Sequence, residues 1–210
     1  MLRYSRAVTT SATAQTGMAD PADLTAKARI RNAALDLFAT KGAASTTIRE
    51  VASAAGVTHG LVVHHFTNKE GLRRAVRQHV IELVRLALES VPGEGTAAEI
   101  RRARDTTVDR MLMAKPVLMA YLRRVMLDPA ETDTELIAML ADFTLGEVRG
   151  LRDRGLAATG APDYVQAMAV MTRELGPRLL APVAQHFWNH LTDAAAGPAP
   201  ELEVTIKPVE

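Results

Sequence analysis

Residues 46–60 read TTIREVASAAGVTHG, and this stretch decides how the rest of the chain is interpreted. Thr47 and Glu50 have the spacing of a capping box, so they predict that a short helix begins after Thr47. Gly56 ends that helix, and Thr58 can cap a second short helix. Two short helices joined by Ala-Gly-Val, the second with a polar leading edge, are typical of a helix-turn-helix.

Helical spacing of apolar residues continues on both sides of this unit, and strand alternation never persists. Upstream, the apolar positions from Ile30 to Phe38 predict a helix of about four turns that Gly42 stops. Downstream, Thr67 and Glu70 have the spacing of a second capping box and predict the start of a long helix. The fold class is therefore all-α, with four or five further helices at about 97–113, 116–127, 134–154, 163–180 and 182–191.

The composition excludes several classes of protein. Of the 210 residues, 48% are hydrophobic and 23% are charged, which is typical of one or two globular domains. Cysteine is absent, and this excludes a disulfide framework, a zinc–thiolate site, an iron–sulfur cluster and a cysteine nucleophile. The sequence contains no run of about 18 apolar residues, so it predicts no membrane span.

Charge is distributed unevenly along the chain, although the formal net charge is only +1. Residues 20–80 hold nine basic and five acidic side chains, whereas residues 81–210 are net acidic. The imbalance suggests that the N-terminal third faces a polyanion. Solvated helix faces would give a similar excess and are the alternative interpretation.

A family resemblance covers about residues 30–72. The stretch 46–60, followed by HHF at 64–66 and NKEGL at 68–72, resembles the DNA-binding domain of TetR-family transcriptional repressors. The resemblance implies an N-terminal three-helix helix-turn-helix DNA-binding domain and a C-terminal helical domain for effector binding and dimerisation. The expected segments are a disordered arm over 1–22, the DNA-binding domain over 23–67, the effector and dimerisation domain over 68–193 with a linking helix over 68–90, and a loosely ordered tail over 194–210.

The second helix of the pair departs from the family pattern. Where the family commonly has Thr-Leu-Tyr, this chain has Leu61-Val62-Val63, so two hydrogen-bonding groups are missing. Leu61 and Val63 can instead pack on thymine methyl groups, and Lys69 at the start of the long helix suits a phosphate contact. A solvated face is the alternative for Lys69 and for Arg49. The candidate DNA-binding residues are Thr47, Arg49, Thr58, His59, Gly60, Leu61, Val63, His64 and Lys69.

Seven of the nine methionines lie between Met111 and Met171. Methionine fills irregular cores and also lines adaptable cavities, so core packing and a ligand site are both possible. The family resemblance favours a cavity for a small apolar or aromatic effector. Its candidate lining residues are Met111, Met119, Tyr121, Met126, Met139, Phe143, Met168 and Met171.

The last helices are apolar on more than one face, which exceeds what burial against one neighbour requires. We assign the surplus to a homodimeric four-helix interface, with Phe187 and Trp188 as anchors. The candidate interface residues are Val165, Leu180, Val183, Phe187, Trp188 and Leu191.

The function that we expect is a ligand-responsive transcriptional regulator. It would be a repressor that binds a palindromic operator as a homodimer and is released by a small apolar effector. The alternatives are a constitutive DNA-binding protein without an effector and, more distantly, an all-α enzyme with an apolar substrate. The expected partners are double-stranded DNA, a second copy of the chain and the effector, with no membrane, at the nucleoid in the bacterial cytoplasm.

Catalytic signatures are missing from the sequence. There is no phosphate-binding loop, nucleophile elbow or metalloprotease motif, so we expect no enzyme. His186 and His190 have a metal-compatible i, i+4 spacing, but no carboxylate accompanies them on that helix face. We therefore expect no metal and no cofactor.

Overall fold

The computed structural model describes residues 25–192 and 197–206. Within these ranges the chain forms eight α-helices and no strand, which confirms the prediction of an all-α fold. The expected arm over 1–22 lies outside the described residues, as do 193–196 and 207–210 of the expected tail. The helices are α1 Ala26–Thr40, α2 Ile48–Ala54, α3 His59–Phe66, α4 Lys69–Glu89, α5 Ala97–Met113, α6 Pro116–Leu127, α7 Thr134–Asp153 and α8 Asp163–Leu191.

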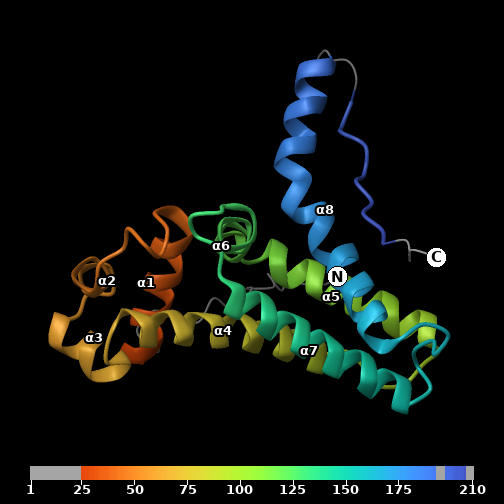
Figure 1. The fold of residues 1–210 in the computed structure, drawn as a ribbon, viewed down its shortest axis with the longest axis horizontal. Coiled ribbons are helices and arrows are strands. Elements are labelled where there is room, and N and C mark those ends of the chain that lie inside the picture. Colours follow the sequence, from red (N-terminus) through yellow and green to blue (C-terminus); the bar gives the residue numbers. More distant parts are fainter. Residues whose placement is uncertain (1–24, 193–196, 207–210) are drawn as a thin grey trace, which may run out of the picture.

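Helices α1, α2 and α3 pack together at one end of the molecule, around the first turns of α4 (Figure 1). The capping box predicted at Thr47 and Glu50 is confirmed, since the Thr47 hydroxyl accepts from the Glu50 amide and the Glu50 carboxylate accepts from the Thr47 amide. Thr58 caps α3 in the same way by accepting from the Leu61 amide. Gly56 has φ +64° between the two helices, a conformation that favours glycine.

The start of α4 differs from the prediction of a second capping box at Thr67 and Glu70, which was wrong. Thr67 has φ 66° at the junction with α3, and Asn68 caps α4 by accepting from the Gly71 amide at 2.8 Å. A residue in the left-handed region cannot provide the extended backbone that an N-cap requires. Glu70 is therefore free to pair with Arg77.

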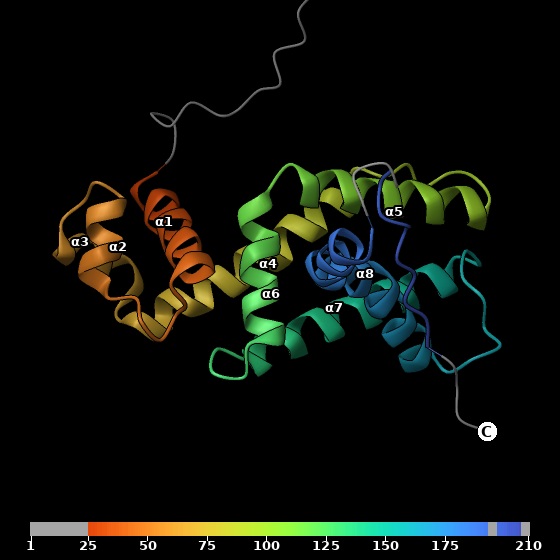
Figure 2. The ribbon, with the colours of Figure 1, turned by 90° about the horizontal axis from the view of Figure 1, so that it is seen from above.

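Helix α4 runs from the N-terminal unit into the C-terminal helices and contacts both (Figure 2). Helix α6 packs against α1, and α7 packs against α8. One continuous hydrophobic core joins buried residues of α1 to α4 with those of α5, α6 and α7, including Ile30, Val76 and Leu122. The two parts therefore share a core instead of meeting only through a linker.

Helix α8 is one helix where the sequence predicted two that break before Pro182. Proline lacks an N–H donor, so Pro182 leaves the carbonyl of Arg178, four residues earlier, without its helical partner. The guanidinium of Arg123 in α6 supplies the missing donors, with Nη2 3.2 Å and Nε 3.4 Å from that carbonyl oxygen. The helix bends and continues, and its last turns protrude from the body (Figure 1).

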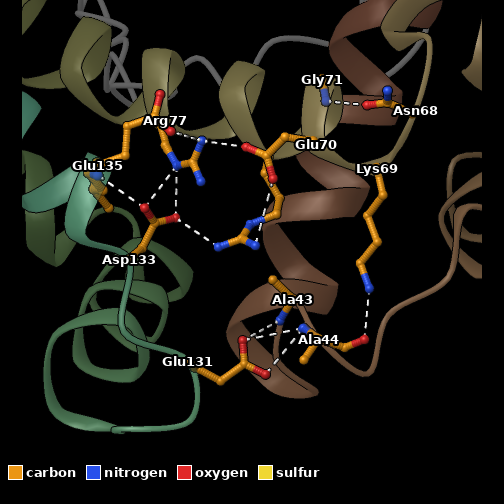
Figure 3. A network of polar contacts seen from close by, with 12 residues as sticks. Ala43, Ala44, Asn68, Lys69, Glu70, Gly71, Arg77, Glu131, Asp133 and Glu135 are labelled. Carbon is orange, nitrogen blue, oxygen red and sulfur yellow. Dashed lines mark hydrogen bonds and ion pairs between the residues drawn. The ribbon is translucent and has the colours of Figure 1, made fainter.

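A buried ion pair joins α4 to the start of α7 (Figure 3). Nε of Arg77 lies 2.9 and 2.8 Å from the two carboxylate oxygens of Asp133, and both residues are only 3% exposed. Asp133 also caps α7 by accepting from the Leu136 amide. Burial alone would raise the pKa of Asp133, but the bonds from Arg77 and Leu136 outweigh it and lower the pKa. Glu70 and Glu135 both pair with Nη1 of Arg77, at 2.8 Å each.

Replacing Arg123 with methionine should destabilise the end of α8. We expect a loss of about 1 kcal/mol in the free energy of unfolding, the typical value of a hydrogen bond, and faster amide exchange over residues 183–191. Adding Pro182→Ala should restore both, because alanine returns the N–H that the Arg178 carbonyl lacks. A double variant that exchanges as fast as Arg123→Met would contradict this account of the continuous helix.

Replacing Asp133 with asparagine should lower the free energy of unfolding by about 3 kcal/mol at pH 7, the cost of breaking a buried pair. The folded pKa of Asp133 lies below its ordinary value of 3.8, so its contribution is complete above that value and is lost as the pH falls. The difference between wild type and variant, measured by urea unfolding, should therefore shrink below pH about 4. Exposed Asp142→Asn is the control and should change little. A constant difference from pH 7 to pH 3 would show that the charge of Asp133 is not what stabilises the fold.

Candidate functional site

The exposed end formed by α2 and α3 carries most of the candidate DNA-binding residues (Figure 1). Val62 and Phe66 anchor α3 in the core, and this leaves the opposite face of the helix to solvent. Leu61 is half-buried, and Val63 is 36% exposed. The two apolar side chains that differ from the family pattern therefore both reach the surface. The fully exposed candidates are Thr47, Arg49, Thr58, His59, Gly60 and His64.

Lys69 is half-buried in the first turn of α4, and its ammonium donates a 2.7 Å hydrogen bond to the carbonyl of Ala44. An ammonium has three N–H donors, so this bond leaves others for an anion. The free amides and the dipole at the start of a helix also favour an anion there. Lys69 is thus held against the turn between α1 and α2 at a place where a phosphate can be bound.

A cavity of about 520 Å³ lies between α4, α5, α6, α7 and α8. Its wall is mainly apolar, and α4 contributes Val80, Val84 and Leu88. A volume of this size fits a small organic molecule that is bound mainly by burial. Further aliphatic lining residues come from the other helices and include Leu112, Leu118, Leu122, Leu140, Val148 and Leu151.

Three of the eight candidate effector residues line this cavity, namely Met111, Phe143 and Met171. The other five lie elsewhere in the structure. Met119 and Tyr121 are buried in the common core, Met126 packs against that core, Met139 is half-buried, and Met168 is 60% exposed. Methionine content did not distinguish core from cavity, and the aliphatic residues that form most of the wall gave no separate signal in the sequence.

Most of the charged residues around the cavity are paired with one another. Arg104 of α5 pairs with Glu147 of α7, and Arg173 of α8 lies 3.0 Å from Asp105 of α5. Arg173 also pairs with Glu174, whose pKa is raised by burial and by the nearby charge of Asp105. These five charges therefore compensate one another, and most of the remaining lining is apolar, with Arg101, Thr144 and Gln166 as its other polar members.

The last turns of α8 expose a row of apolar side chains. Leu180, Val183, Phe187 and Leu191 follow a three- to four-residue spacing and are between 41% and 78% exposed. Val165 and Trp188, the other two candidate interface residues, are half-buried, and the Trp188 indole donates a 3.1 Å bond to the Gly197 carbonyl. Tyr164 and Met168 are also largely exposed on this helix, but the sequence did not single them out for an interface.

Among residues 25–192 and 197–206, no group of three histidine, cysteine or acidic side chains could hold a metal ion. No helix within the same ranges has the length and apolar character needed to cross a membrane.

Residues 30–76 match the family model described as "Bacterial regulatory proteins, tetR family". The HTH-type transcriptional regulatory protein RaaS of Mycobacterium tuberculosis is 37% identical over 141 residues, which are 65% of this chain and 60% of RaaS. The HTH-type transcriptional repressor Rv3405c of the same species is 44% identical over 68 residues, 32% of this chain and 36% of that protein. The match therefore spans less than two thirds of the length of either relative.

The fold extends the similarity beyond these segments. The transcriptional regulator RHA1_ro04179 from Rhodococcus sp. Rha1 has a TM-score of 0.62 at 22% identity, over 78% of this chain and 87% of that one. It therefore shares the N-terminal helix-turn-helix and the C-terminal helical domain. Both curated relatives are named as transcriptional regulators. Residues 30–76 therefore match the TetR family of bacterial regulatory proteins, and the described helices have the fold of a solved transcriptional regulator.

Proposed function

We propose that this regulator is a repressor that binds a palindromic operator as a homodimer and is released by a small apolar effector. The observation that carries the proposal is that one helix reaches both candidate sites. Lys69 lies in the first turn of α4, and Leu88, near its far end, lines the cavity. At 1.5 Å per residue the two positions are about 28 Å apart along the helix. A shift of α4 at the cavity would therefore move the DNA-binding end.

The DNA contacts that we propose come from the exposed face of α3, the start of α2 and Lys69. Thr58, His59 and His64 offer hydrogen-bonding groups to bases or phosphates, and the surface-reaching Leu61 and Val63 offer apolar contacts to thymine methyl groups. The remaining candidates, Thr47, Arg49, Gly60 and Lys69, would follow the sugar–phosphate backbone. The exposure of this face supports these contacts, because its residues can reach DNA without rearrangement.

A homodimer is proposed because one recognition helix reads too few base pairs for a useful site. A twofold dimer presents two such helices to half-sites about 34–36 Å apart. The exposed row Leu180, Val183, Phe187 and Leu191 supports an interface on the last turns of α8, because large apolar side chains at this spacing gain most from burial against a second copy.

The effector that we propose is small and mainly apolar, since the cavity wall is mainly apolar and most of its charged residues are already paired. A constitutive DNA-binding protein without an effector is the alternative, and it would leave the 520 Å³ cavity without a role. We also propose that the protein acts at the nucleoid in the cytoplasm, where its DNA would be.

DNA binding is tested with duplexes that the purified protein selects from a random pool. Lys69→Ala should weaken specific and nonspecific binding together and reduce the slope of log affinity against log salt by roughly one, the loss of one phosphate contact. His59→Ala should relax base preference instead. Exposed Arg102→Ala removes the same charge from α5 and should leave affinity and slope unchanged. An unaltered slope in the Lys69 variant would remove its assigned role, and failure to select any DNA would refute the proposed function.

Assembly is tested by analytical ultracentrifugation at micromolar concentration. The wild type should sediment as a dimer, and Phe187→Asp should sediment as a monomer because a carboxylate in the interface would be buried without a partner. Gln185→Asp adds the same charge at an exposed polar position of α8 and should stay dimeric. A wild-type monomer that still binds selected DNA, or a dimeric Phe187→Asp variant, would contradict the interface on α8.

A further inference from the structure

The turn between α1 and α2 has backbone groups that its own helices do not satisfy. The amides of Lys41 and Gly42 are the last along the chain that donate hydrogen bonds to carbonyls of α1. The amides of Ala43 and Ala44 come next, after the chain has left the helix at Gly42, where φ is +89°. Ala43 is 6% exposed, so its N–H needs a partner from within the protein.

Glu131, in the loop between α6 and α7, is that partner (Figure 3). Its carboxylate accepts from the Ala43 amide at 2.8 Å and from the Ala44 amide at 3.2 Å, across 88 and 87 residues of sequence. Hydrogen bonds to an ionised acceptor are stronger than those between neutral groups. A loop of the C-terminal helices therefore holds the backbone of the helix-turn-helix unit.

The space at Gly42 shows how closely the two parts approach. A Cβ atom placed on Gly42 would lie 2.2 Å from Oε1 of Glu131 and 3.3 Å from Nη1 of Arg124. Any side chain at this position would thus displace the carboxylate, in addition to being strained at φ +89°. Glycine is needed here for the turn and for the approach of the loop.

Arg124, near the end of α6, also holds this segment. Its Nε donates to the Ala39 carbonyl at 3.2 Å and its Nη2 to the Thr40 carbonyl at 3.0 Å. These carbonyls lie in the last turn of α1, where the helix dipole favours a cation. The cation thus binds the helix end, and the anion of Glu131 binds the amides that follow it.

The clamped turn is connected directly to the candidate DNA-binding groups. Ala44 gives its N–H to Glu131 and its carbonyl to Lys69, at 3.2 and 2.7 Å. The buried hydroxyl of Thr46 donates to the Gly42 carbonyl at 2.7 Å, and Thr47 then caps α2. The residue that Glu131 holds is therefore bound by Lys69 as well, and the chain enters α2 one turn later, so Glu131 holds the helix-turn-helix as one unit.

The loop that carries Glu131 joins the two helices α6 and α7, and both also line the cavity. We infer that Glu131 and Arg124 are positioning residues that orient the helix-turn-helix unit relative to the effector-binding helices, and so set the separation of the two recognition helices in the dimer. This inference rests on the proposed function. The two side chains bind backbone groups, so they hold a geometry without contacting DNA themselves.

The clamp is tested first without DNA, by amide hydrogen exchange of the free protein. Glu131→Ala should raise the exchange rates of the Ala43 and Ala44 amides by about tenfold or more, the worth of a hydrogen bond to a charged group. Amides in the middle of α1 should keep their rates, which shows that the variant is folded. Glu135→Ala removes a neighbouring carboxylate that pairs with Arg77 and should leave Ala43 and Ala44 unchanged. Unchanged rates in Glu131→Ala would overturn the clamp.

The positioning role is tested with the DNA that the wild type selects, rebuilt as single half-sites and as duplexes whose half-site separation differs by one or two base pairs. The wild type should discriminate among the separations. Glu131→Ala should bind the single half-site as the wild type does, but its discrimination should fall by about tenfold, a typical coupling between sites. Gly42→Ala should reduce the discrimination in the same way, because its Cβ atom displaces the carboxylate of Glu131.

The outcomes separate the inference from the function on which it rests. If the wild type selects DNA and Glu131→Ala keeps the wild-type discrimination despite faster exchange of Ala43 and Ala44, the positioning role is wrong and DNA binding stands. A loss of half-site affinity equal to the loss of discrimination would also overturn it, since the residue would then act on the DNA contacts themselves. If the wild type selects no DNA, the proposed function fails and the positioning role fails with it.

Discussion

The buried ion pair between Arg77 and Asp133 is the constraint on which the arrangement of the molecule depends. It fixes the beginning of α7 to the middle of α4, and the loop that enters α7 is thereby fixed as well. Glu131 lies two residues before Asp133 in that loop and holds the turn after α1. Because the ionised pair is almost inaccessible to water, the loss of either partner would leave the other charge in the core with only its more exposed partners, Glu70 and Glu135 for Arg77 and Arg73 for Asp133. The placement of the helix-turn-helix therefore follows from a contact made inside the C-terminal part.

Two routes connect the cavity with the candidate DNA-binding face. Helix α4 provides lining residues at its far half and Lys69 at its start, while α6 and α7 reach the turn at Ala43 and Ala44 through Arg124 and Glu131. Both routes meet at the bond between Lys69 and the Ala44 carbonyl. Since packed helices move as rigid bodies, a ligand that shifts α4 relative to α6 would change the orientation of α2 and α3.

Local chemistry predicted the parts of this structure that depend on neighbouring residues. The capping box at Thr47 and Glu50, the all-α class and the cap at Thr58 all follow from short sequence spacings. One local spacing misled, because Thr67 and Glu70 do not form the predicted capping box, and the predicted break in α8 failed because of a distant partner. Helix α8 continues past Pro182 because Arg123, far away in sequence, supplies donors to the Arg178 carbonyl. Periodicity likewise did not separate Met119 and Tyr121, which are buried in the common core, from the residues that line the cavity. Periodicity shows which face of a helix is buried but not what covers it, so Glu131, Arg124 and Asp133 gave no signal of their roles.

The central claim, that the helix-turn-helix is held rigidly to the C-terminal helices, can be tested by measuring a distance. The chain has no cysteine, so Ser53→Cys in α2 and Asp142→Cys in α7 provide two unique sites for spin labels, and both positions are exposed. Pulsed dipolar spectroscopy on labelled protein diluted with unlabelled protein reports the distance within one chain. The account predicts a narrow distance distribution in the otherwise wild-type chain and a clearly broader one when Glu131→Ala is added. Distributions of equal width in the two proteins would contradict it.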